Sequence, residues 1–214
     1  MRWLRFFENG GLVKISGKIY VSVFTLIAFA MMLVCDFSVY TAIVLTSILV
    51  HEISHVVTLE MCGGRIIRIV VYPFGADMVC DTSQLSFQKE FICVVSGGMT
   101  NILLSLVFWQ VFCINDAKPA LFFSVCNAFL GIANLIPFSS FDGGRALYLL
   151  LSTFLLPDRV CMIQKYIDIL CLVFLCIFGV VFVGFCGFNI SLVASLVYSL
   201  FSAGIFRLYK KRYI

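Results

Sequence analysis

Long apolar runs alternate with short polar segments along most of the chain. A run of about 20 mostly apolar residues is long enough to cross a bilayer as an α-helix. Six runs reach or approach this length, so the sequence predicts an all-α polytopic membrane protein with about six transmembrane helices. The predicted spans cover residues 19–34, 38–60, 91–114, 120–136, 167–184 and 188–206.

The segment after the second predicted span has a different pattern. Residues 65–72 are rich in β-branched side chains, residues 73–76 interrupt them with Pro-Phe-Gly-Ala, and a second short run follows to residue 80. This pattern predicts a β-like hairpin or re-entrant segment. Irregular backbone at membrane depth lies only against protein or a water-filled cavity, so the hairpin could line a substrate cleft. An ordinary interfacial loop is the alternative.

Composition supports a membrane environment. The chain is 62% hydrophobic and only 12% charged, whereas soluble domains have roughly 25% charged residues. That leaves too little polar surface for a water-soluble fold, and the length fits one membrane domain over residues 1–214. The ten cysteines form no C-x-x-C pair, which favours small packing residues over a disulfide scaffold.

The distribution of basic residues predicts the orientation. With six spans, fourteen of the 15 Lys and Arg residues lie in the segments assigned to one side, and only Lys118 lies on the other. The positive-inside rule then places both termini in the cytoplasm. We therefore expect an integral protein of a bacterial cell membrane, surrounded by lipid and without a nucleic-acid partner.

The most distinctive motif lies within the second predicted span. His51-Glu52-Ile53-Ser54-His55 is an H-E-x-x-H sequence, and it contains both histidines of the chain. Residues four apart share one face of a helix, so the two imidazoles can bind one Zn²⁺ while Glu52 acts as general base. The alternative is a chance pentapeptide of interfacial or core polar residues. It is disfavoured because ionisable groups within a span are energetically costly.

Two histidines leave a catalytic zinc ion one protein ligand short, because such sites usually have three. No other histidine exists, so the third ligand must be a carboxylate or a thiolate. Asp142 is the best candidate, since Gly143 and Gly144 allow the backbone to approach the metal closely. A helix N-cap role for Asp142 is equally compatible with local rules. Asn101, near small residues suited to close helix packing, is a candidate hydrogen-bonding group near the site or a contact between helices.

The motifs resemble those of a known family. His51 to His55, followed later by Asn-Leu-Ile-Pro-Phe-Ser-Ser-Phe-Asp-Gly-Gly-Arg over residues 134–145, is similar to the two signatures of the site-2 proteases, the intramembrane zinc metalloproteases. The resemblance covers about residues 15–200. The short six-span layout is most similar to the family's sporulation proteases, which carry a C-terminal nucleotide-sensing CBS domain that we do not expect here.

The resemblance implies roles for individual residues. His51, His55 and Asp142 would bind one zinc ion per chain, and Glu52 would be the general base. Asn134, within the motif that contains Pro137, would help to position the substrate. The segment 64–78 is similar to the family's membrane-embedded hairpin, so Phe74 and Gly75 at its turn would contact the substrate. Gly97-Gly98-Met99-Thr100-Asn101 departs from the Gly-Pro-x-x-Asn that family members often have.

These observations predict an intramembrane zinc metalloprotease that carries out regulated proteolysis of a membrane-associated or transmembrane precursor. The resemblance suggests a pro-sigma factor during sporulation, with membrane proteins as possible inhibitory or regulatory partners. The alternative is a non-proteolytic membrane scaffold or a metal transporter. A transporter should have ionisable residues along several spans, and the predicted spans have almost none outside the two motifs.

Overall fold

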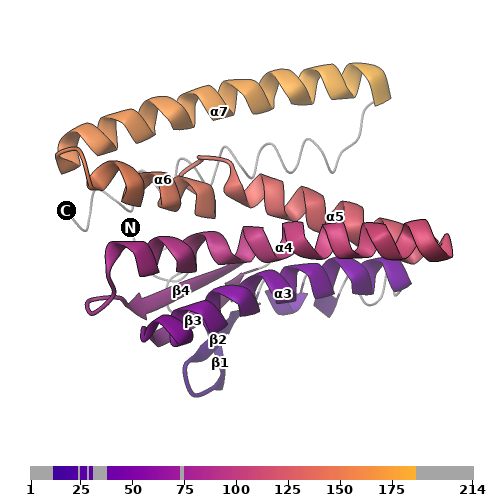
Figure 1. Ribbon diagram of the computed structural model, residues 1–214, viewed down its shortest axis with the longest axis horizontal. Coiled ribbons are helices and arrows are strands. Elements are labelled where there is room, and N and C mark those ends of the chain that lie inside the picture. Colours follow the sequence, from indigo (N-terminus) through magenta and orange to yellow (C-terminus); the bar gives the residue numbers. More distant parts are fainter. Residues whose placement is uncertain (1–11, 24, 28, 31–37, 73–74, 187–214) are drawn as a thin grey trace. The chain divides into compact units, whose positions relative to one another are not determined.

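The computed structural model describes residues 12–23, 25–27, 29–30, 38–72 and 75–186 (Figure 1). The chain divides into two compact units, residues 1–132 and 133–214, which we describe separately. Within the described part, three helices are long and apolar enough to cross a membrane. They are α3 (Val39–Cys62), α4 (Phe87–Asn115) and α5 (Lys118–Leu135).

These three helices match the second, third and fourth predicted spans, with ends that differ by a few residues. The predicted span 167–184 lies within α7 (Pro157–Cys186), which follows the short helix α6 (Asp142–Ser152). Pro157 begins α7, because proline is well tolerated in the first turn of a helix. The predicted span 188–206 lies outside the described residues.

The prediction of an all-α fold is wrong, because the first unit contains a four-stranded sheet in the order β1-β2-β3-β4. Strands β1 (Leu12–Ser16) and β2 (Ile19–Ser22) form an antiparallel pair, and β2 pairs in parallel with β3 (Arg65–Tyr72). Residues 19–22 therefore do not begin the first predicted span. Hydropathy cannot separate a short β-branched strand from the start of an apolar helix.

The hairpin predicted after the second span is present. Strand β3 pairs in antiparallel fashion with β4 (Gly75–Asp81), and Tyr72 faces Gly75 at the turn end of the ladder. Phe74 lies outside the described residues. The hairpin follows directly from the end of α3, where Gly63 adopts a left-handed conformation with φ 90° and donates its backbone N–H to the carbonyl of Glu60.

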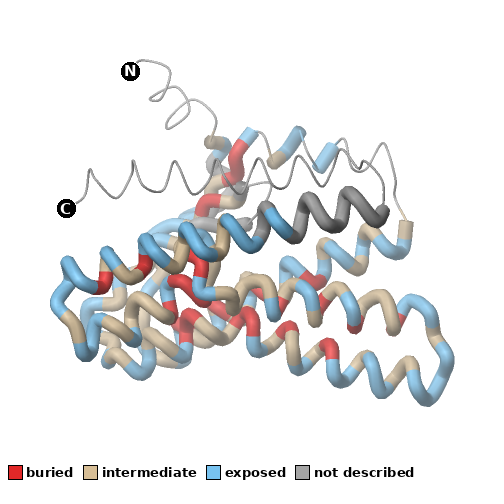
Figure 2. Tube along the Cα trace, turned by 90° about the horizontal axis from the view of Figure 1, so that it is seen from above, coloured by how far each residue is buried: buried red, intermediate tan, exposed pale blue. Residues whose placement is uncertain are grey.

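The three long helices bury small and polar residues and expose apolar ones. In Figure 2 the buried positions cluster along the inner sides of the helices. Large apolar side chains such as Leu103, Leu106 and Phe129 are exposed. Lipid is the solvent that suits such an outer surface. The buried positions are Ser47, His51, His55 and Leu59 on α3, Cys93, Val94, Gly97, Gly98, Asn101 and Ser105 on α4, and Ala120, Ser124, Asn127 and Gly131 on α5.

Helices α4 and α5 approach each other closely at Gly131. A Cβ atom at this position would lie 2.8 Å from the carbonyl oxygen of Gly98 and 2.9 Å from Cγ1 of Ile102. The first of these neighbours is backbone and cannot rotate away. The contact therefore requires glycine, as is typical of tightly packed membrane helices.

We expect Gly131→Val to lower the free energy of unfolding by about 1–3 kcal/mol, because the added atoms overpack a backbone contact. Detergent-induced unfolding followed by helical circular dichroism measures this change. Ile132→Val is the matched control, since Ile132 is 61% exposed and its replacement should change stability by less than about 0.5 kcal/mol. Equal stability of the two variants would contradict the close approach of α4 and α5.

Candidate metal site

The two histidines lie one helical turn apart on the buried face of α3. Both side chains are at least nine-tenths buried, and their rings meet edge to face with centroids 4.9 Å apart. The Nε2 atoms are 3.3 Å apart. Two nitrogens bound to one tetrahedral Zn²⁺ at about 2.0–2.1 Å lie roughly 3.3–3.4 Å from each other. The spacing of the pair therefore fits a single zinc ion.

The opposite edge of each ring determines which nitrogen can bind a metal. Nδ1 of His55 lies 2.8 Å from the carbonyl oxygen of Cys93, and Nδ1 of His51 lies 3.2 Å from Oδ1 of Asn101. Both oxygens are acceptors only, so each Nδ1 donates and each neutral ring has its lone pair on Nε2. Two lone pairs that face each other at 3.3 Å repel, and a shared cation removes this repulsion.

The amide of Asn101 is oriented by a second amide. Its Nδ2 donates to the carbonyl of Ser47 at 3.3 Å and to Oδ1 of Asn127 at 3.0 Å. Nδ2 of Asn127 donates in turn to Oγ of Ser47 at 2.8 Å and to the carbonyl of Phe123 at 2.9 Å. Both amides are fully buried. Because each Nδ2 faces oxygens, the network leaves Oδ1 of Asn101 as the acceptor for His51.

Such an outer layer of hydrogen bonds is characteristic of metal-binding histidines, where it holds the ring and raises its basicity. Asn101 thus contacts His51 and also joins α4 to α3 and α5. It therefore has both roles proposed from the sequence: a hydrogen-bonding group beside the histidines and a contact between helices. Ser47 and Asn127 were not predicted from the sequence. Polar residues at helical spacing within apolar spans, at positions 47, 51 and 55 on α3 and 124 and 127 on α5, were the available signal.

Gly97 of α4 faces the metal-binding edge of the pair. A Cβ atom there would contact Nε2 of His55 and would lie 2.8 Å from Cε1 of His51. The absence of a side chain at this position therefore keeps open the space beside both imidazoles.

The other predicted site residues lie as follows. Glu52 is half-buried on α3, next to His51, and Gly75 is the first residue of β4. In the second unit, Asn134 is half-buried in the last turn of α5, and Pro137 is exposed just after that helix.

Asp142 is the first residue of α6 in the second unit. The N-cap position belongs to Phe141, whose side chain makes no capping hydrogen bond. The alternative role of Asp142 as an N-cap residue is therefore wrong.

We expect Gly97→Ala to weaken zinc binding at least tenfold, because the new methyl group occupies the space beside Nε2 of His55. Alanine is the better helix former, so a loss of helix propensity cannot cause this result. The dissociation constant is measured by competition with a chelator of known affinity. The control is Met99→Ala, at a position 48% exposed on the same helix. Unchanged zinc affinity in Gly97→Ala would place the metal elsewhere.

We expect Asn101→Leu to weaken zinc binding by about 10–100-fold, since it removes the acceptor that orients His51. Asn127→Leu should have a smaller effect in the same direction, because it acts through Asn101. Ser105→Ala is the matched control: it removes a buried contact between α4 and α5, the Ser105–Ser124 hydroxyl pair at 3.2 Å, outside this network. An equal loss in the control would show that general packing of the helices, and not the orientation of His51, sets the affinity.

Comparisons with known proteins point to one group. Stage IV sporulation protein FB of Bacillus subtilis is 28% identical over 138 residues, which are 63% of this chain and 48% of that protein. A zinc metalloprotease of Methanocaldococcus jannaschii is 31% identical over 111 residues, 50% of this chain and 32% of that protein. The chain thus matches less than half the length of either relative. No protein-family model matches the chain.

The fold is also similar to a solved structure. The site-2 protease from Methanocaldococcus jannaschii superposes with a TM-score of 0.64 over 90% of this chain and 93% of that structure, at 20% sequence identity. Together with the three apolar helices, these relatives identify the chain as a membrane protein. The sequence relatives and the shared fold confirm the resemblance predicted from the two motifs, which is to the site-2 protease family of zinc metalloproteases.

Proposed function

We propose that this protein is an intramembrane zinc endopeptidase that cuts a membrane-associated precursor protein. The observation that carries the proposal is the convergence of the Nε2 atoms of His51 and His55 at 3.3 Å, in a motif that places Glu52 beside them. Asp142 would supply the third ligand, since two imidazoles and one carboxylate form a donor set that could hold one metal ion.

When bound, zinc supplies Lewis acidity and lowers the pKa of a coordinated water towards about 7. The carboxylate of Glu52 would take the proton from the attacking water and later deliver it to the nitrogen of the leaving amine. Asn101 and the carbonyl of Cys93 hold the two imidazoles through their Nδ1 atoms. Asn134 would position the substrate near the reacting bond.

A substrate helix at membrane depth has its backbone amides bonded within the helix, so it must unwind locally before attack. Among the described strands, β4 ends the order β1-β2-β3-β4, so its outer edge could accept an added strand. An unwound substrate would gain main-chain hydrogen bonds there, and Phe74 and Gly75 would contact it. The name of the Bacillus relative refers to sporulation, and a pro-sigma factor is the substrate we propose to test first.

The test is cleavage of a membrane-tethered precursor by the purified protein, comparing wild type with Glu52→Gln. The substitution removes the general base and keeps nearly the same shape, so we expect the cleavage rate to fall about 10²–10⁴-fold. Zinc content, measured by atomic emission, should remain near one ion per chain in both proteins. Glu60→Gln serves as the control, because Glu60 is an exposed carboxylate at the end of the same helix.

The possible results separate the alternatives. Loss of cleavage with zinc retained supports the protease. Zinc bound by both proteins, with no cleavage of any precursor in a panel of membrane-tethered candidates, would favour a scaffold or a transporter. Absence of zinc from the wild type would overturn the metal site itself.

A further inference from the structure

The loop that carries Asp142 is compact and tightly packed. In the second unit, residues 136–144, which we call the Asp142 loop, comprise the connection after α5 (136–141) and the first three residues of α6. The backbone N–H of Phe141 donates to the carbonyl of Phe138 at 2.8 Å, and that of Gly144 donates to the carbonyl of Phe141 at 3.1 Å. Cβ atoms at Gly143 and Gly144 would collide with the carbonyl oxygens of Leu135 and Phe138, respectively. The loop therefore folds back on its own backbone.

Helix α7 holds one side of this loop through Asp168. One carboxylate oxygen of Asp168 accepts the backbone N–H of Ser139 at 2.9 Å, and the other accepts the hydroxyl of Ser139 at 2.7 Å. Hydrogen bonds to an ionised carboxylate are roughly twice as strong as those between neutral groups. A pair of such bonds to a single residue fixes both its position and its orientation.

Helix α7 holds the other side through Gln164. Nε2 of Gln164 donates to the carbonyl of Gly144 at 3.1 Å. The side chain is only 5% exposed, and within the described residues its buried Oε1 has no hydrogen-bond partner. A buried acceptor without a hydrogen-bond partner destabilises the folded state. An apolar side chain at this position would avoid that cost, so stability alone does not explain the glutamine.

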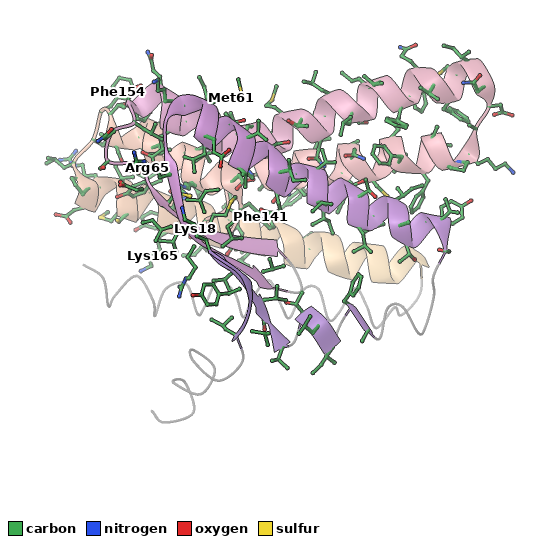
Figure 3. The ribbon with its side chains drawn as sticks, turned by 90° about the horizontal axis from the view of Figure 1, so that it is seen from below. Lys18, Met61, Arg65, Phe141, Phe154 and Lys165 are labelled. Atoms are coloured by element: carbon green, nitrogen blue, oxygen red, sulfur yellow. The ribbon has the colours of Figure 1, made fainter. Side chains whose placement is uncertain are left out.

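The two contacts lie on either side of Asp142. Ser139 precedes it by three residues and Gly144 follows it by two, while Gln164 and Asp168 are four apart on α7 and so share one face. The neighbouring Lys165 is exposed instead (Figure 3). Figure 3 also marks Phe141, the residue directly before Asp142.

We propose that Gln164 and Asp168 are positioning residues, which fix the backbone on both sides of Asp142 and thereby hold its carboxylate for metal binding. This inference rests on the proposed role of Asp142 as a zinc ligand. Gln164 and Asp168 do not touch the metal in this scheme. They act through Gly144 and Ser139. Zinc affinity is higher when the Asp142 loop is already held in the binding conformation, because less rearrangement is then needed on binding.

The experiment measures two quantities for each full-length variant in detergent: the zinc dissociation constant by chelator competition, and the melting temperature of the metal-free protein. The variants are Gln164→Leu, Asp168→Asn and Asp142→Asn. Asp158→Asn is the matched control, because Asp158 is an exposed carboxylate in the first turn of the same helix. Its zinc affinity should equal that of the wild type.

We expect Gln164→Leu and Asp168→Asn to weaken zinc binding by about tenfold or more, in the range found for outer-layer partners of metal ligands. Gln164→Leu should melt at the same temperature as the metal-free wild type or higher, because it removes the unsatisfied acceptor. A purely structural role predicts the opposite pattern: a lower melting temperature with unchanged affinity of the folded protein for zinc.

Two results would overturn the proposal, and they are distinguishable. If Asp142→Asn weakens zinc binding while Gln164→Leu and Asp168→Asn leave it within twofold of the wild type, Asp142 is a ligand that α7 does not position. If Asp142→Asn itself binds zinc as tightly as the wild type, the proposed ligand set fails, and the positioning role fails with it.

Discussion

The first unit depends on one constraint: a polar group at membrane depth must find its partner within the protein. The side chains of Ser47, Asn101 and Asn127 meet this requirement together, because each amide donates to oxygens of a neighbouring helix or of the next amide. The same bonds join α3, α4 and α5. The same hydrogen bonds therefore hold the three helices together and orient the His51 ring, so a substitution that breaks them affects both.

Much of the site could be predicted from the sequence because its signals are local. His51, Glu52 and His55 lie within five residues, and helical periodicity alone brings the two imidazoles onto one face. The end of α3 at Gly63 has an equally local cause, since few residues other than glycine adopt a left-handed backbone. The β-branched run that became β3 was also recognisable, because Pro73 and Gly75 interrupt it within a short distance.

What could not be predicted depends on contacts between distant segments. Strand β2 pairs with residues fifty positions later, and nothing in its own four residues distinguishes it from the start of an apolar helix. In the sequence, Asn127 cannot be told from any other polar residue in a span. Only the packing of α5 against α4 shows that it pairs with Asn101. Asp168 likewise has no local pattern that indicates its partner, and only the fold brings it to Ser139.

The parallel pairing of β2 with β3 places α3 within the crossover connection between two neighbouring strands. Ile19 lies beside Ile69 and Val21 beside Val71, so the strands that precede and follow the histidine helix are joined to each other. Strand β3 cannot slide smoothly along β2, because a shift of one residue would turn every side chain of the strand to the opposite face. Displacements that keep the same face come in steps of two residues, roughly 6.6 Å. The position of the hairpin against β2 is therefore limited to a few discrete registers.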